Sequence, residues 1–133
     1  MTFPDYFQSL DAEKMRAEYP TGPEFLEAFR SMSRDELRAR QEERFQRVVK
    51  RGWEVAFYKR HWSGAGLEPG DIKGLDDITK IPRYSKSDLM ESIENHPPFG
   101  DFHGMDTYKP EERPPVVFHT TSGTTGTPQV LFF

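Results

Sequence analysis

Glycines and hydroxyl side chains crowd residues 119–129 (HTTSGTTGTPQ), and this combination can bind a phosphate group. Gly123 and Gly126 permit positive φ angles, which turn successive backbone N–H groups toward one point. Six hydroxyls within eight residues add donors without the bulk that would hold phosphate oxygens away: Thr120, Thr121, Ser122, Thr124, Thr125 and Thr127. The stretch therefore predicts a loop that stabilises negative charge on a phosphate chain.

Two other interpretations of this stretch have to be weighed. Serine, threonine and glycine are also common in turns, so on composition alone a plain hairpin connection is equally compatible. The P-loop of nucleotide triphosphatases is excluded, because it needs a lysine directly after its last glycine and a helix behind it. Here Thr127 follows Gly126, and Pro128 leads into an apolar, strand-like run.

Two apolar runs flank the loop and predict the strands that hold it. Residues 116–119 (VVFH) precede it and residues 130–133 (VLFF) follow it. A charged, proline-rich stretch at 109–115 (KPEERPP) marks a boundary before this strand–loop–strand unit. An apolar run at 130–133 with nothing after it to cover it leads us to expect the N-terminal part of a longer protein, truncated here.

The long charged stretch in the first half of the chain predicts a surface helix. Ser33 is a candidate N-cap, and Glu36 three residues later completes a capping box. Basic residues and then Gly52 indicate the end, which gives a helix over 34–51. Residues 1–31 are expected to be loosely organised apart from a short helix over 23–30.

Two further helices are predicted before the boundary. Residues 53–66 (WEVAFYKRHWSGAG) carry aromatic side chains at helical spacing, which we expect to pack in a core. Ser85 with Asp88 begins the next helix, and Pro97 ends it. The patterns therefore predict a mainly helical region at 1–110 followed by a strand–loop–strand unit at 111–133.

Composition limits the partners. The 133 residues carry 18 basic and 22 acidic side chains for a net charge of −4, interleaved along the chain, which argues against nucleic acid. The absence of cysteine excludes disulfides, a thiolate nucleophile and a Cys-ligated metal. The sequence begins with no signal-peptide pattern and has no apolar stretch of membrane-spanning length, so we expect a cytoplasmic protein that does not contact membranes.

The four histidines are not predicted to do chemistry. His119 comes directly before the loop but has no acid or nucleophile near it in sequence, so we interpret it as a strand residue. His61, His96 and His103 lack the spacing of metal ligands. No catalytic residue and no metal ligand is therefore predicted within the chain.

The stretch TTSGTTGTP resembles the phosphate-binding signature T-S-G-[ST]-T-G-x-P-K of the adenylate-forming superfamily. Upstream, AFYKRHWSGAGLEPGDIKGLDDITKIPRYSKSDL is similar to the N-terminal region of phenylacetate-CoA ligases, with their G-[VL]-x-P-x-D-I and I-P-x-x-x-K-x-D-L patterns. The resemblance covers roughly residues 35–133 and implies a partial α/β fold, in which residues 111–133 are the start of an α/β nucleotide-binding domain. Gln129 replaces the usual signature lysine, and Thr127 stands where the phenylacetate-CoA ligase branch tends to have one.

This resemblance implies an AMP-forming acyl- or aryl-CoA ligase that activates a carboxylic acid with ATP and then forms the CoA thioester. It implies ATP, Mg²⁺ and coenzyme A as cofactors and substrates, an aromatic acid as the favoured substrate, and a possible homo-oligomer. It assigns the ATP phosphates to the loop residues Thr121, Ser122, Gly123, Thr124, Thr125 and Gly126. The other parts of the family's site lie beyond residue 133, so this fragment alone is expected to be inactive.

Two alternative functions stay open at this point. The chain could be a non-enzymatic helical interaction module with a glycine-rich tail. It could also belong to an adenylating enzyme that passes its acyl group to another acceptor, since such an enzyme shares the loop.

Overall fold

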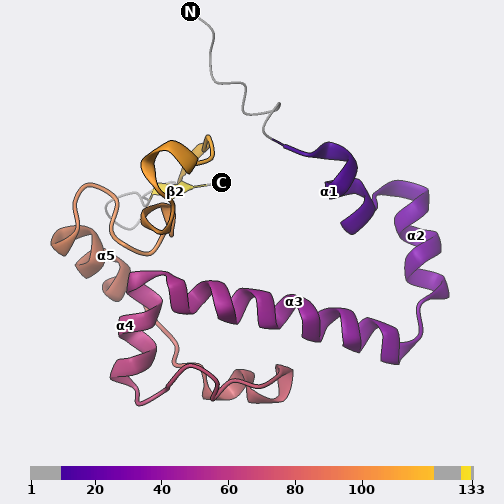
Figure 1. Ribbon diagram of the computed structural model, residues 1–133, viewed down its shortest axis with the longest axis horizontal. Helices are drawn as coiled ribbons and strands as arrows, with labels where there is room; N and C mark the ends of the chain where they lie inside the picture. Colours follow the sequence, from indigo (N-terminus) through magenta and orange to yellow (C-terminus); the bar gives the residue numbers. More distant parts are fainter. Residues whose placement is uncertain (1–9, 122–129, 133) are drawn as a thin grey trace, which may run out of the picture.

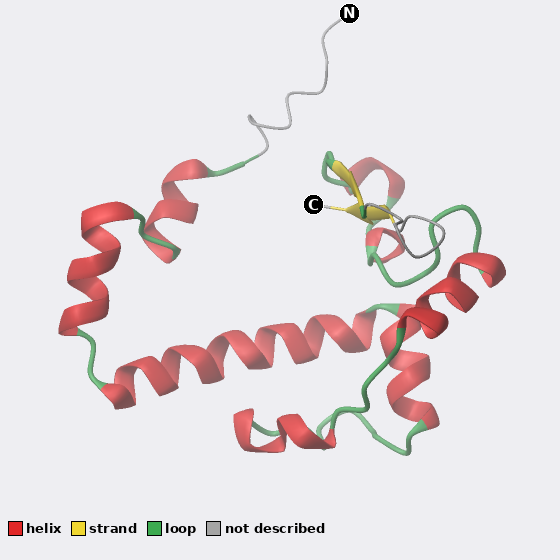
Figure 2. Ribbon diagram, turned by 180° about the vertical axis from the view of Figure 1, so that it is seen from behind, coloured by secondary structure: helices red, strands yellow, loops and turns green. Residues whose placement is uncertain are grey.

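The computed structural model describes residues 10–121 and 130–132 of the chain. One long helix, α3 (Arg34–Glu54), forms the axis of the molecule (Figure 1). The short helix α2 (Gly22–Ser31) lies at its N-terminal end, and α1 (Ala12–Glu18) reaches the middle of α3 through Glu18. The C-terminal end of α3 contacts α4 (Ala56–Gly64), and α5 (Lys86–Asn95) and the strands β1 (Phe118–Thr120) and β2 (Val130–Phe132) lie toward that same end of the molecule (Figure 2).

Local sequence signals fix the start of α3. The Ser33 hydroxyl accepts from the Glu36 N–H at 3.2 Å, while the Glu36 carboxylate accepts from the Ser33 N–H at 2.7 Å. Both hydrogen bonds satisfy backbone donors that the first helical turn leaves free. The predicted capping box is confirmed.

The predicted end of this helix is wrong, because α3 continues through Gly52 to Glu54. A methyl carbon at position 52 would lie 3.0 Å from Trp62 Cζ3 and 3.1 Å from Trp62 Cζ2. Gly52 therefore serves the close approach of Trp62 to the helix and does not terminate it. The turn comes instead at Val55, whose extended backbone separates α3 from α4.

The core lies where α3 and α4 meet. Val49, Trp62 and Ile72 form its buried centre, with partly buried apolar side chains packed around them: Phe45, Trp53, Tyr58, Leu67 and Ile81. Trp53 and Trp62 meet edge to face at 5.1 Å between ring centroids. The expectation that these aromatics pack in a core is confirmed. The 3₁₀ helix η1 (Leu75–Lys80) packs against α3, and Glu42 of α3 accepts from the Leu75 N–H.

Helix α1 departs from the expectation of a loosely organised segment. The Asp11 side chain caps it by accepting from the Lys14 N–H at 2.9 Å. Arg47 of α3 binds the Glu18 carboxylate at 2.7 Å, and Arg44 donates to the Glu18 carbonyl at 2.9 Å. These contacts join α1 to α3 across more than twenty residues of sequence, which no local pattern reveals.

The two strands pair antiparallel, with Phe118 opposite Phe132, His119 opposite Leu131 and Thr120 opposite Val130. The first begins two residues later than predicted. Two short 3₁₀ helices, η2 (Met105–Thr107) and η3 (Pro110–Glu112), lead from α5 to this pair. Within residues 10–121 and 130–132, no helix is both long and apolar enough to cross a membrane.

Candidate functional site

The strand pair holds the two ends of the glycine-rich loop close together. Thr120 and Val130 are paired, so residues 121–129 make the connection between the strands. Thr121 is exposed at the end of β1, while the predicted phosphate-binding residues Ser122, Gly123, Thr124, Thr125 and Gly126 lie outside the described part of the chain. The connection is longer than the two to five residues common in hairpins, which leaves room for a ligand-binding loop.

The histidines take the positions of structural residues. His119 lies in β1 opposite Leu131, as predicted. The His61 Nε2 lies 3.0 Å from the Arg83 carbonyl oxygen, and His103 Nδ1 accepts from the Met105 N–H at 3.0 Å. In the described ranges, no three His, Asp or Glu side chains are grouped so that they could hold a metal ion.

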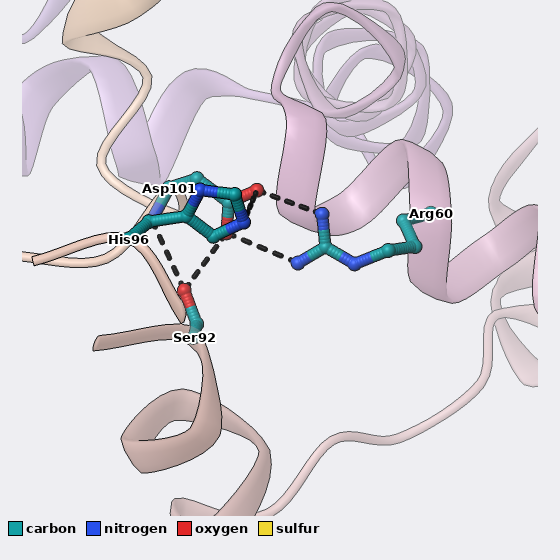
Figure 3. A network of polar contacts seen from close by, with 4 residues as sticks. All are labelled: Arg60, Ser92, His96 and Asp101. Atoms are coloured by element: carbon teal, nitrogen blue, oxygen red, sulfur yellow. Dashed lines mark hydrogen bonds and ion pairs between the residues drawn. The ribbon is translucent and has the colours of Figure 1, made fainter. Parts of the chain in front are cut away.

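A polar network around Asp101 joins α4 to α5 (Figure 3). Arg60 of α4 donates from Nη1 to Asp101 Oδ2 at 2.8 Å and from Nη2 to Asp101 Oδ1 at 3.1 Å. Ser92 of α5 donates to Asp101 Oδ1 at 2.8 Å and accepts from the Asp101 N–H at 3.0 Å. His96 Nε2 lies 3.6 Å from Asp101 Oδ2. The two hydrogen bonds from Arg60 to Asp101 make a bidentate pair, which is the strong form of a carboxylate–guanidinium contact.

Burial makes the network costly to break. The Asp101 side chain is 7% exposed and Ser92 is 2% exposed. Burial by itself raises the pKa of Asp101, but the hydrogen bonds from Arg60 and Ser92 outweigh it and hold the pKa below its ordinary value. The same pairing raises the pKa of Arg60. Asp101 is therefore an ionised, fully bonded carboxylate at neutral pH and not a proton-transfer group.

Neither Tyr58 nor the groove beside this network is assigned a chemical role. Burial and the neighbouring Tyr84 raise the pKa of Tyr58 to about 12, so its hydroxyl stays neutral at physiological pH. Phe57, Arg60 and His61 of α4 face Ser92 and His96 across an open groove of about 690 Å³. Ser92 in the lining of this groove is 2% exposed and its hydroxyl donates to Asp101, which is ion-paired with Arg60, so we assign the groove no chemistry.

Sequence reasoning did not find the Asp101 network. Arg60 and Asp101 are separated by 41 residues, and Ser92 and Asp101 by nine. The only local signal is the position of Ser92 on the inner face of α5, where a small buried hydroxyl requires a partner.

The amino-acid sequence is similar to those of phenylacetate-coenzyme A ligases. The chain is 41% identical over 102 residues to the phenylacetate-coenzyme A ligase of Thermus thermophilus, covering 76% of this chain and 21% of that enzyme. It is 38% identical over 110 residues to the enzyme of that name from Aromatoleum evansii, covering 82% and 23%.

Among solved structures, 2-hydroxyisobutyryl-CoA ligase in complex with 2-HIB-AMP and CoA superposes with a TM-score of 0.60 at 37% identity, over 75% of this chain and 20% of that one. This chain is a relative of the adenylate-forming superfamily. The similarity to adenylate-forming ligases inferred from TTSGTTGTP and the upstream patterns is thereby confirmed, as is the partial α/β fold class. The chain spans about a fifth of the length of the adenylate-forming relatives it matches. No protein-family model matches it.

Proposed function

We propose that the chain is part of an AMP-forming acid–thiol ligase. Such an enzyme activates a carboxylic acid with ATP to an acyl-adenylate and then transfers the acyl group to the thiol of coenzyme A. The observation that carries this proposal is the 41% identity to a phenylacetate-coenzyme A ligase, together with the sequence SGTTGTP between two paired strands. A solved relative, 2-hydroxyisobutyryl-CoA ligase, holds an acyl-AMP and CoA together.

In this proposal the loop after β1 binds the ATP phosphates. Its donors are the backbone N–H groups and hydroxyls of Thr121, Ser122, Gly123, Thr124, Thr125 and Gly126. Donors fixed around the departing pyrophosphate stabilise the charge that develops on it as the carboxylate attacks the α-phosphorus. With Thr127 and Gln129 where related loops carry lysine, amides and hydroxyls supply this stabilisation.

Mg²⁺ belongs to the proposed reaction, but residues 10–121 and 130–132 offer no carboxylate or histidine cluster that fits a metal ion. We therefore assign no residue of the described chain to Mg²⁺. The chain contributes phosphate binding and positioning, and the acid-binding and thioester-forming groups come from elsewhere in the enzyme.

The finer features of the proposal rest on the relatives and on exposed surface. An aromatic acid is favoured, because the matched curated relatives act on phenylacetate by name. A homo-oligomer accords with the exposed apolar side chains Phe25, Leu26 and Phe29 of α2. Use of ATP and CoA favours the cytoplasm. We place the boundary between the helical region, 1–110, and the nucleotide-binding domain, 111–133, at the proline-rich stretch before β1.

Acid-dependent ATP–pyrophosphate exchange tests this function directly. The full-length gene product would be assayed with phenylacetate, benzoate and 2-hydroxyisobutyrate, with a no-acid reaction as control. We expect exchange with at least one acid, strongest with an aromatic one, and CoA-dependent release of AMP with the same acid. Absence of acid-dependent exchange across the panel would reject the proposal, and exchange without CoA-dependent AMP release would indicate a different acyl acceptor.

A further inference from the structure

The Asp101 network lies where three segments of the chain meet. Arg60 comes from α4, Ser92 from α5, and Asp101 begins the connector that runs to β1 (Figure 3). The Asp101 carbonyl also accepts from the Phe57 N–H at 3.4 Å. One buried carboxylate and its backbone therefore fix the position of this connector relative to two helices.

Contacts on both sides of Asp101 extend this anchoring toward the strand. Just before it, the Phe99 ring lies against Phe118 of β1, with 5.7 Å between centroids. Just after it, Arg51 of α3 donates to the Gly104 carbonyl at 3.0 Å and lies over the Tyr108 ring at 4.9 Å. The connector is thus tied to the helices between Asp101 and Tyr108, and the contact of Phe99 with Phe118 links the Asp101 turn to β1.

The turn before Asp101 favours glycine at position 100. Gly100 has a φ of +77°, a conformation that L side chains rarely adopt, and a Cβ there would lie 2.7 Å from the Ser92 hydroxyl oxygen. Ser92 approaches this closely because it bonds Asp101. The conformation of the turn and the Asp101 network therefore depend on each other, and Phe99 lies one residue before Gly100 and two before Asp101.

β1 needs such support, because it buries little of its own surface. All three of its residues are exposed, and Phe118 is 55% exposed. A three-residue strand with so little burial does not fix its own position. The residue that follows β1, Thr121, opens the loop that we assign to the ATP phosphates.

We propose that Asp101 is a positioning residue for this phosphate loop: with Arg60 and Ser92 it holds the 99–101 turn, and Phe99 in that turn holds β1 where the loop begins. The inference rests on the proposed function. A loop that acts by placing donors around a pyrophosphate loses rate steeply when it is displaced, since a shift of about 1 Å costs on the order of a hundredfold. Asp101 does not contact the reacting atoms and acts through Phe99 and β1.

The test compares variants on this path with a matched variant away from it, all in the full-length protein. Asp101→Asn removes the charge that pairs with Arg60, and Phe99→Leu removes the ring against Phe118. Phe99→Tyr keeps the ring, and Ile72→Ala truncates the core cluster around Val49 and Trp62 as a control for general loss of stability. Hydrogen–deuterium exchange would follow the amides of residues 116–121, and pyrophosphate exchange would give kcat and the KM values for ATP and acid.

For Asp101→Asn and Phe99→Leu we expect about tenfold faster amide exchange at β1 and about a tenfold loss in kcat/KM for ATP. The KM for the acid should stay within about twofold, Phe99→Tyr should match the parent, and Ile72→Ala should leave the β1 amides and the KM for ATP unchanged. Unchanged protection of β1 in Asp101→Asn and Phe99→Leu would overturn the proposal, and so would Ile72→Ala behaving as they do. If the parent lacks acid-dependent pyrophosphate exchange, the proposed function fails, while the amide-exchange comparison still decides whether Asp101 positions β1.

Discussion

Replacing Gly52 by alanine should destabilise the chain, although alanine has the higher helix propensity. Gly52 lies in the last turn of α3, so alanine is favoured over glycine there by at most about 1 kcal/mol. Against this gain, the new methyl carbon would overlap the Trp62 ring, with Cζ3 and Cζ2 at 3.0 and 3.1 Å. Trp62 is only 6% exposed and meets Trp53 edge to face, so it has little room to withdraw. Overpacking of this kind costs about 1–3 kcal/mol, and the tight packing favours the upper end. We therefore expect a net loss of about 2 kcal/mol.

Urea unfolding followed by tryptophan fluorescence measures this effect where it arises, because Trp53 and Trp62 are the two tryptophans of the chain. In a Trp62→Phe background the overlapping ring is absent, and Gly52→Ala should become neutral or stabilising by about 1 kcal/mol. Gly64→Ala is the matched control, since a Cβ there meets nothing within 4 Å. Equal effects of Gly52→Ala in both backgrounds, or a more stable Gly52→Ala chain, would refute the packing argument.

Three further outcomes follow from the structure. Ser33→Ala should lower the free energy of unfolding by about 1 kcal/mol in urea titrations, because it removes the α3 N-cap; an unchanged midpoint would contradict this. Folding lowers the pKa of Asp101 from its ordinary value of 3.8. The folding stability that the ionised carboxylate contributes is therefore present above pH 3.8 and is lost as the pH falls through the lowered pKa. The stability gap between parent and Asp101→Asn should therefore narrow from about pH 5 to about pH 3 in urea titrations, and a constant gap would argue against this account. The isolated 133 residues should self-associate through exposed apolar side chains such as Phe25, Phe29 and Phe118, and a concentration-independent monomer in light scattering would count against that.

Features encoded by neighbouring residues could be predicted from the sequence. The Ser33–Glu36 capping box spans four residues, and the Ser85–Asp88 pair that starts α5 does the same. The phosphate-binding role that we propose for residues 121–126 also comes from contiguous residues, their glycines and hydroxyls. In each case the residues that form the feature are also neighbours in the chain, so their spacing carries the physical information.

Features that depend on partners far away in sequence could not be predicted. Gly52 after basic residues has the pattern of a helix end, and only the position of Trp62 shows that the glycine serves packing. Asp101 looks like a loop residue, and its role depends on Arg60, 41 residues earlier. Helix α1 is likewise held by Arg44 and Arg47 of α3. Tertiary contacts determine the role of Gly52, the role of Asp101 and the position of α1.

Pyrophosphate exchange by a Thr124→Val/Thr125→Val variant of the full-length protein tests the central claim most directly. Valine keeps the shape of threonine approximately but removes two hydroxyl donors from the loop, so the exchange rate should fall by about one to three powers of ten. The affinity for the acid should be nearly unchanged, and Gly123→Val should be at least as damaging because it blocks the backbone conformation and the approach of the phosphates. Parental exchange rates in both variants would show that residues 121–129 only connect two strands.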